Sequence, residues 1–271
     1  MISFQQHFQA RNADIILSTF PKSGTTWLKA LVFAILNRTR YPLNSDSHPL
    51  INSNPHDLVP TLELNIYKKD KCPNLKQFHD PRIFATHAGY SMLPRSILDS
   101  SCRIIYICRN PLDQLISAWC FFQKVYQDGV ALEKVFELAC EGVHNYGPFW
   151  DHVLGYWEAS LKKPGKILFL KYEDLKRDIT SQSKKLADFL GFPFSQEEEQ
   201  LEVIDDISTL CSFDTMKEME VNKTSAQNSN YFRNAKVGDW TNYLTPSMAQ
   251  QFIKVNEEKF KGSGITFEMD C

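Results

Sequence analysis

Side chains that can bind an anion gather in one short segment, which reads Pro21, Lys22, Ser23, Gly24, Thr25, Thr26 and Trp27. The apolar run at 14–21 predicts a buried strand before it, and the apolar spacing at 25–38 predicts a helix after it. A turn from a strand into a helix presents free backbone N–H groups at the positive end of the helix dipole. The segment therefore predicts a phosphate-binding turn, with an ordinary turn that carries a surface lysine as the alternative.

This turn differs from the Walker A motif, which has an earlier glycine and places its lysine after the second glycine. A P-loop kinase or nucleoside triphosphatase would also need an acidic partner for magnesium, and the sequence has no such pattern. That function remains a third alternative, which magnesium-stimulated ATP hydrolysis would support.

A second candidate for anion binding is Arg109, at the end of the apolar run 102–109. Asn110 and Pro111 predict the start of a helix, and Ser117 falls about two turns into it. Arginine can bind a phosphate through two parallel hydrogen bonds. Because ligands bind at the carboxyl ends of parallel strands, we predict phosphate contacts here, with a surface ion pair as the alternative for Arg109.

Two further segments carry groups that can do chemistry. His87 ends a strand candidate at 82–87, and an imidazole can take a proton from a hydroxyl near neutral pH. A hydrogen-bonded structural histidine is the alternative. The polar loop 231–240 contains a second arginine and aromatic residues, which suit an anionic ligand that bears a base, unless it is simply an exposed basic loop.

The elements that must position these residues alternate along the chain. We predict a fourth strand at 166–172, and helices at 131–142, 148–162, 180–190 and 245–260, of which 180–190 ends at Gly191. We expect a long excursion at 41–76 with a short helix near 57–66, an acidic solvated helix face at 196–206, and a loop at 222–239. Strands that alternate with helices predict an α/β fold, a single domain over 1–271 with a mainly parallel sheet flanked by helices.

Composition limits the function classes. The chain has 30 Lys and Arg against 32 Asp and Glu, a net charge of −2, which argues against a protein that coats nucleic acid. Seven cysteines without a C-x-x-C pair argue against a disulfide framework or a structural zinc site. Because the sequence has neither a secretory signal nor an apolar run of membrane-spanning length, we expect a cytoplasmic protein without a membrane partner.

Six ordered motifs resemble the cytosolic-type sulfotransferases, and in detail their plant branch. They are FPKSGTTWLKAL, ATHAGY, YICRNPLDQLISAW, YGPFWDHVLGYW, FLKYEDLKRD and YFRNAKVGDW, and the similarity runs from about Ile15 to the C-terminus. The resemblance implies transfer of a sulfuryl group from 3′-phosphoadenosine 5′-phosphosulfate (PAPS) to a hydroxyl of a small acceptor, without a metal. It also implies that the strand–loop–helix at the first motif is P-loop-like and binds the phosphosulfate.

The resemblance implies a role for each matching residue. His87 would be the catalytic base, and Lys22 would stabilise the leaving group within the phosphosulfate-binding residues 22–27. Arg109 and Ser117 would bind the 3′-phosphate. Tyr172 and Phe213 would lie around the adenine, and four residues, Phe232, Arg233, Asn234 and Ala235, would close over the 3′-phosphate.

The chain departs from the family pattern in several places, among them the segment after His87, where Gly89 stands before Tyr90 and the plant branch more usually has Pro. Asn234 and Ala235 stand where the closing motif usually has Lys-Gly, which removes a charge and would cost about 1–2 kcal/mol if the backbone at the alanine is left-handed. Lys236 is a candidate to replace part of the lost charge. The N-terminal segment is short for the family, so we expect part of the acceptor pocket or its lid to be missing. The dimer motif of animal relatives is not reproduced, so the sequence predicts no oligomeric state.

Two functions follow from the resemblance and these departures. The first is an active sulfotransferase, and the second is a degenerate relative that binds nucleotide or a small ligand with weak or no turnover. Plant relatives use flavonoids, brassinosteroids and other hydroxysteroids, hydroxyjasmonates and desulfoglucosinolates as acceptors. With 13% aromatic residues, the composition favours an acceptor that contains rings, such as a phenol or a steroid.

Overall fold

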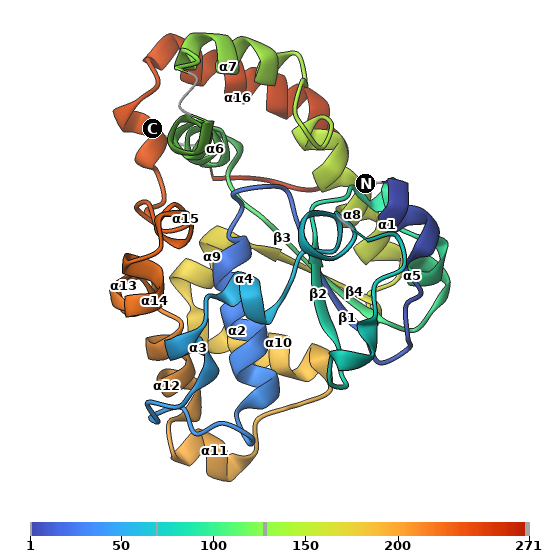
Figure 1. The fold of residues 1–271 in the computed structure, drawn as a ribbon. Coiled ribbons are helices and arrows are strands. Elements are labelled where there is room, and N and C mark those ends of the chain that lie inside the picture. The colour runs from blue at the N-terminus through green and yellow to red at the C-terminus, as the bar shows by residue number, and fades with distance from the viewer. Residues whose placement is uncertain (1, 69, 127–128, 269–271) are drawn as a thin grey trace.

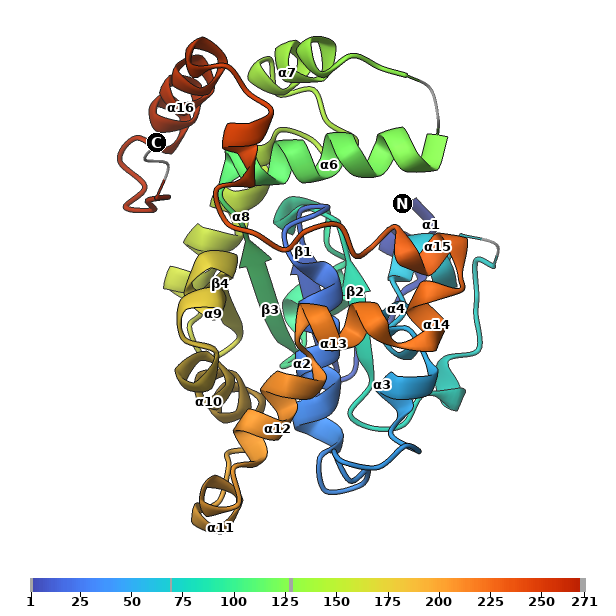
Figure 2. The same ribbon diagram turned by 90° about the vertical axis from the view of Figure 1, so that its left-hand side faces the viewer.

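A parallel sheet of four strands forms the centre of the computed structural model, which describes residues 2–68, 70–126 and 129–268 (Figures 1 and 2). The strands are β1 (Ile15–Thr19), β2 (Ile83–Thr86), β3 (Arg103–Cys108) and β4 (Ile167–Lys171). Their order in the sheet is β2-β1-β3-β4, and all three neighbouring pairs are parallel. The register places Ile15 beside both Ile83 and Arg103. The four predicted strands and the parallel sheet are confirmed.

Helices cover both faces of this sheet and one of its ends (Figure 1). The longer helices are α2 (Thr25–Asn37), α6 (Pro111–Tyr126), α7 (Leu132–Cys140), α8 (Phe149–Lys162), α10 (Ile179–Leu190), α12 (Val203–Leu210) and α16 (Pro246–Phe260). The shorter ones are α1 (Ile2–His7), α3 (Pro49–Asn52), α4 (Pro55–Leu58), α5 (Arg95–Asp99), α9 (Tyr172–Arg177), α11 (Gln196–Gln200), α13 (Phe213–Glu218), α14 (Glu220–Lys223) and α15 (Ala226–Ser229). A π-helical turn η1 (Leu62–Ile66) and three 3₁₀ turns, η2 (Leu75–Gln77), η3 (Tyr90–Met92) and η4 (Asp239–Asn242), complete the set.

Alternate strand residues pack on opposite faces of the sheet. Ile15 and Leu17 lie in a core with residues of α2 and α10, whereas Ile16 lies between them in the sequence and packs in a second core with α1 and α8. Since both faces are covered, the strands are apolar on both sides, as expected for a parallel sheet. A third core joins α6, α7 and α16 at one end of the molecule (Figure 2).

The helix boundaries that the sequence signals at residues 110 and 191 are confirmed. The side chain of Asn110 accepts a hydrogen bond from Leu112 N at 2.9 Å, which caps the start of α6. Gly191 adopts φ 78° at the end of α10, where the left-handed backbone favours glycine.

The prediction of a loop throughout 222–239 is wrong in its first half, because two one-turn helices, α14 and α15, occupy it. They are held by polar caps rather than by apolar periodicity. Ser225 Oγ accepts from Asn228 N at 3.2 Å, and the Asn228 side chain donates to the carbonyl of Val221 at 2.9 Å. The short helix expected near 57–66 is likewise divided between α4 and η1, with Pro60, which has no N–H, between them.

Candidate functional site

The turn between β1 and α2 leaves backbone donors free at the start of the helix. Gly24 adopts φ 108°, and a Cβ atom there would lie 2.8 Å from the ring of Tyr172. The first helical hydrogen bond runs from Leu28 N to Gly24 O at 3.0 Å, so the amides of residues 25–27 have no partner within the helix. The amide of Ser23 instead donates to the carbonyl of Phe20 at 3.2 Å, inside the turn. The first-turn amides of α2 are therefore available to an anion, as the sequence predicts, whereas the amide of Ser23 is not.

Lys22 lies in this turn with a left-handed backbone, φ 69°, and its Nζ is 4.0 Å from the centroid of the Phe121 ring. Burial lowers the pKa of Lys22 to about 7, and the positive charges of Arg109, Arg233 and Lys124 act in the same direction. Lys22, Arg109, Arg233 and Lys124 all line one cavity, and this concentration of positive charge suits an anion.

His87 is oriented by its ring nitrogen Nδ1, which lies 2.9 Å from the carbonyl of Thr19 and 3.1 Å from Thr19 Oγ1. Because a carbonyl only accepts, Nδ1 carries the proton and Nε2 is left with a free lone pair. Burial lowers the pKa of His87 to about 4, and the charges of Lys29 and Lys22 add to this effect while the Thr19 carbonyl opposes it. The ring is therefore neutral at pH 7 and able to accept a proton.

The main chain around His87 is held from two sides. Glu63, on η1, accepts from His87 N at 2.7 Å and from Thr86 Oγ1 at 2.9 Å. His152, on α8, donates through Nε2 to the carbonyl of His87 at 3.0 Å, while Tyr106 lies 2.9 Å from its Nδ1. The histidine thus has a fixed position as well as a fixed tautomer.

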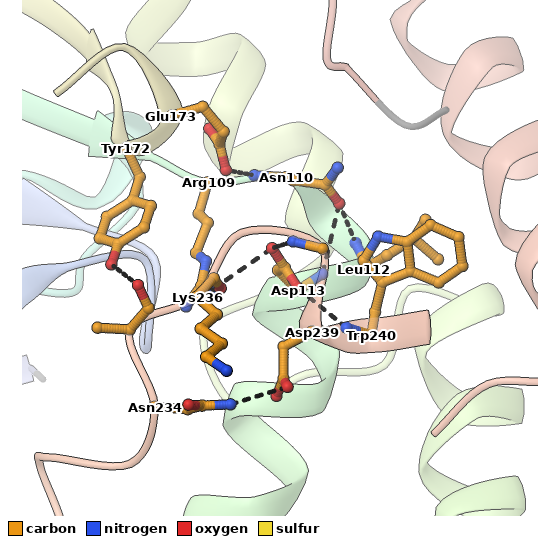
Figure 3. A network of polar contacts seen from close by, with 12 residues as sticks. Arg109, Asn110, Leu112, Asp113, Tyr172, Glu173, Asn234, Lys236, Asp239 and Trp240 are labelled. Carbon is orange, nitrogen blue, oxygen red and sulfur yellow. Dashed lines mark hydrogen bonds and ion pairs between the residues drawn. The ribbon is translucent and has the colours of Figure 1, made fainter. Parts of the chain in front are cut away.

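Arg109 fastens the segment that follows residue 235 (Figure 3). Its Nη2 donates to the carbonyl of Lys236 at 2.6 Å and lies 3.4 Å from Asp113 Oδ2. Asp113 in turn accepts from the amides of Gly238 and Trp240, at 2.8 and 3.1 Å. The end of β3 and the first turn of α6 therefore hold the closing loop in place.

The closing loop carries the residues that the sequence analysis placed over a phosphate. Arg233 pairs with Asp239. The other oxygen of Asp239 accepts from Asn234 Nδ2 at 2.8 Å (Figure 3). Ala235 adopts φ 51°, so the left-handed backbone that alanine disfavours is present, as the sequence analysis anticipated. Its carbonyl accepts from Tyr172 OH at 3.2 Å. Lys236 is exposed and does not line the cavity described next.

These segments surround one cavity of about 690 Å³. Of the residues that the sequence analysis selected, fourteen line it: Lys22, Gly24, Thr25, Thr26, Trp27, His87, Arg109, Ser117, Tyr172, Phe213, Phe232, Arg233, Asn234 and Ala235. Ser23 alone does not, although its side chain is buried in the same turn. In the lining, the rings of Trp27 and Tyr172 meet edge to face at 5.4 Å. Phe121, Phe122 and Tyr146 also line the cavity and were not predicted from the sequence.

Three buried polar atoms of this site have no hydrogen-bond partner among the described residues: Ser23 Oγ, Arg109 Nε and Arg233 Nε. A buried donor without a partner costs about 1–3 kcal/mol, so native proteins supply one. Ser23 Oγ is buried in the turn, whereas the two arginine nitrogens belong to charged side chains that line the cavity and fit an anionic ligand with several oxygen atoms.

Three further polar residues, Lys29, His56 and Glu63, were not predicted from the sequence. His56 lines the cavity, while Lys29 contacts His56 and Glu63 contacts His87. Lys29 is fully buried, and the available signal was its position within an otherwise apolar helix directly after the turn. His56 follows an Asn54-Pro55 pair typical of a helix start, and Asn54 Oδ1 accepts from its amide at 2.8 Å. The contacts themselves depend on the path of the 41–76 excursion, which no periodicity predicts.

The described residues contain no group of three or more His, Cys, Asp or Glu side chains that could hold a metal ion. Within the described ranges, none of the helices combines the length and apolar character that a membrane span requires.

Comparisons with known proteins give a consistent match. The family model described as "Sulfotransferase domain" matches residues 12–264. Cytosolic sulfotransferase 14 of Arabidopsis thaliana is 48% identical over 279 aligned positions, which cover 98% of this chain and 80% of the relative. Cytosolic sulfotransferase 15 of the same plant is 46% identical over an alignment that covers 99% of this chain and 78% of the relative.

Solved structures show the same fold. An Arabidopsis thaliana protein described as a candidate steroid sulphotransferase is 41% identical, with a TM-score of 0.77, over 98% of this chain and 82% of its own. A mouse sulfotransferase, SULT7A1, solved in complex with PAP, is 32% identical, with a TM-score of 0.72, over 94% of this chain and 86% of its own.

Proposed function

The chain belongs to the sulfotransferase family, and from that premise we propose that it transfers a sulfuryl group from PAPS to a hydroxyl of a small acceptor molecule. The observation that carries this proposal is the convergence of Lys22, His87 and Arg109 on one cavity from the ends of three parallel strands. A mouse relative was solved with PAP, the product nucleotide that such a reaction leaves.

The cavity has the donors that a nucleotide with two phosphate positions needs. We assign the 5′-phosphosulfate to the turn at 22–27 and the 3′-phosphate to Arg109, Ser117 and the closing loop. The unpartnered Arg109 Nε and Arg233 Nε support the second assignment, because both side chains line the cavity, and the amides of residues 25–27, which are free within the helix, support the first. Trp27, Tyr172, Phe213 and Phe232 would surround the adenine, since rings stack on aromatic side chains.

The reaction is an in-line displacement that resembles phosphoryl transfer, so catalysis depends on positioning and on stabilisation of developing charge. When bound, PAPS supplies the sulfuryl group and a phosphate leaving group. His87 Nε2 would take the proton from the acceptor hydroxyl, and the amides of residues 25–27 would donate to the anion. Lys22 would stabilise the negative charge that develops on the leaving oxygen. A bound anion raises the pKa of Lys22, which favours the charged form of the lysine at pH 7. It also raises the pKa of His87, which makes the imidazole a stronger base.

We propose a phenolic or steroid acceptor, such as a flavonoid, a brassinosteroid or a similar plant metabolite. The cavity is also lined by Phe121, Phe122 and Tyr146, and the Tyr146 ring lies 5.4 Å from that of His87. Aromatic walls favour flat or ring-bearing ligands by burial and stacking. We propose the cytoplasm as the location, because relatives of this chain are named cytosolic sulfotransferases.

The test is transfer of radiolabelled sulfate from PAPS to a panel of flavonoids, simple phenols, hydroxysteroids and primary alcohols. We expect labelled product with at least one ring-bearing acceptor. Calorimetry with 3′-phosphoadenosine 5′-phosphate should show binding in the same preparation. Tight nucleotide binding without transfer to any acceptor would contradict the proposal and favour a binding protein derived from an enzyme.

A further inference from the structure

A buried lysine and a histidine reach the anion-binding turn through a chain of hydrogen bonds that the mechanism above does not use. Lys29 Nζ, on α2, lies 3.0 Å from His56 Nδ1 and 3.0 Å from Thr61 Oγ1. The other ring nitrogen, His56 Nε2, lies 2.9 Å from Thr26 Oγ1. Both His56 and Thr26 line the cavity, so the chain begins in the core and ends at the turn.

The chemistry of these groups sets a direction for the chain. The charged amino group of Lys29 only donates, so in this state His56 Nδ1 accepts and the ring proton lies on Nε2. Nε2–H then donates to Thr26 Oγ1, which leaves the hydroxyl hydrogen for another acceptor. Burial and the charges of Lys29, Lys22 and His87 hold the pKa of His56 well below its ordinary value, so the ring stays neutral. It then carries a single proton, and its hydrogen bonds decide which nitrogen holds that proton.

The His56 ring is also fixed in place. Tyr231 stacks on it with centroids 4.0 Å apart and ring planes 18° apart. Asn54 accepts from the amide of His56 at 2.8 Å and donates to Asn222 at 2.7 Å, and both asparagines are buried. A ring held on its face and at its backbone can transmit the direction of one hydrogen bond to the next.

We propose that Lys29 and His56 are positioning residues that direct the Thr26 hydroxyl into the cavity, where it donates to a nonbridging oxygen of the transferring sulfuryl group. The inference rests on the proposed function, because it assigns the hydroxyl to that group. An oriented donor of this kind stabilises charge in the transition state without reorganisation.

A double-mutant cycle on the full chain tests whether the lysine acts through the threonine. Thr26→Val removes the hydroxyl at constant shape, and Lys29→Met removes the amino group. We expect single-turnover rates about 10²-fold lower in Thr26→Val, about tenfold lower in Lys29→Met, and equal to Thr26→Val alone in the double variant. Lys185→Met, at an exposed position of α10, is the control and keeps the wild-type rate. Effects that multiply in the double variant would overturn the proposal.

If Lys29→Met does not fold, His56→Phe takes its place in the cycle, because phenylalanine keeps the stack on Tyr231 and removes both ring nitrogens. A measurement without turnover comes from ¹⁵N spectra of the histidine rings, which report the tautomer. We expect His56 with its proton on Nε2 in the wild type, and a mixture in Lys29→Met. A proton on Nδ1, or a ring unaffected by Lys29→Met, would refute the inference even in an active enzyme. Absence of transfer by the wild type would instead refute the proposed function.

Discussion

At the scale of the residue, the site depends on how each polar side chain is held. His87 is fixed through Nδ1 by Thr19, through its amide by Glu63 and through its carbonyl by His152. These three partners come from β1, η1 and α8, so the position of one imidazole is set by three separate segments. The arrangement leaves Nε2 as the only ring atom available to an acceptor hydroxyl.

Replacement of His87 tests its role as the base. We expect His87→Ala to lower the rate of sulfuryl transfer by about 10²–10⁴-fold, because general base catalysis contributes about that factor. Nucleotide binding should persist, since the anion contacts lie elsewhere. The measurement is single-turnover transfer with the acceptor found in the panel. His79→Ala, at an exposed histidine, serves as the control, and an undiminished rate in His87→Ala would remove the assignment.

The pH dependence of turnover tests the role of Lys22. With a pKa of about 7, the free enzyme loses the lysine charge as the pH rises through 7, so kcat/KM should fall on the alkaline side. The bound anion raises the pKa of this lysine, so the alkaline limb of kcat should lie at higher pH. Lys22→Arg, which keeps its charge, should remove the limb. An unchanged alkaline limb in Lys22→Arg would contradict the role and point to Lys29, whose pKa burial also lowers to about 7.

At the scale of the element, the closing loop joins parts of the chain that are far apart in sequence. Arg109 at the end of β3 and Asp113 in α6 bind the main chain of residues 236–240, while Tyr172 at the start of α9 binds the carbonyl of Ala235 (Figure 3). The loop is thereby held although alanine occupies a left-handed position. Its strain is offset by hydrogen bonds from three other segments.

Substitution of Ala235 measures that strain. Ala235→Gly relieves about 1–2 kcal/mol of left-handed strain. It also increases the conformational entropy of the unfolded chain, which costs about 0.4–1 kcal/mol, so we expect the free energy of unfolding to rise by up to about 1.6 kcal/mol. Chemical denaturation measures the change. Ala226→Gly, at an exposed alanine of α15 that lies outside the left-handed region, lacks the strain and should lower the free energy of unfolding instead. A loss of stability in Ala235→Gly as large as in the control would contradict the reading of φ 51° as strained.

At the scale of the whole molecule, the carboxyl ends of the parallel strands gather the site at one edge of the sheet. β1 lies between β2 and β3, and the helices that follow β1 and β2 cover opposite faces, so the winding changes direction there. Such a switch point is where α/β proteins bind ligands. Burial of histidines around this edge has a second effect, on the stability of the fold in acid.

His144 offers a clean measure of that effect. Burial lowers the pKa of His144 to about 4, so between pH 6.5 and 4 the unfolded chain binds a proton that the native state does not. Stability from this group is complete above pH 6.5 and is lost as the pH falls, by up to about 1.4 kcal/mol per unit. In urea titrations from pH 7 to 4.5, His144→Asn should therefore show a flatter loss of unfolding free energy than the wild type. His79→Asn keeps the wild-type slope, and parallel curves for His144→Asn would contradict the lowered pKa.

Local patterns in the sequence determined the strands, the longer helices and the residue types of the site. The apolar run before Pro21, the cap at Asn110 and the glycine at 191 act over a few positions, so they can be recognised in the chain itself. The single-domain organisation stays a prediction, and so do the catalytic roles of His87 and Lys22, which the resemblance to the family implies.

Only the tertiary structure decided which groups complete the site. The approach of Lys29 to His56, of Glu63 to His87 and of Asp113 to the closing loop joins residues 24 to 125 positions apart. Contacts of that range depend on the path of irregular segments such as 41–76 and on what the sheet brings together, and no local spacing encodes them. The helices α14 and α15 were missed for a related reason, because polar caps and neighbouring helices stabilise them in place of an apolar face.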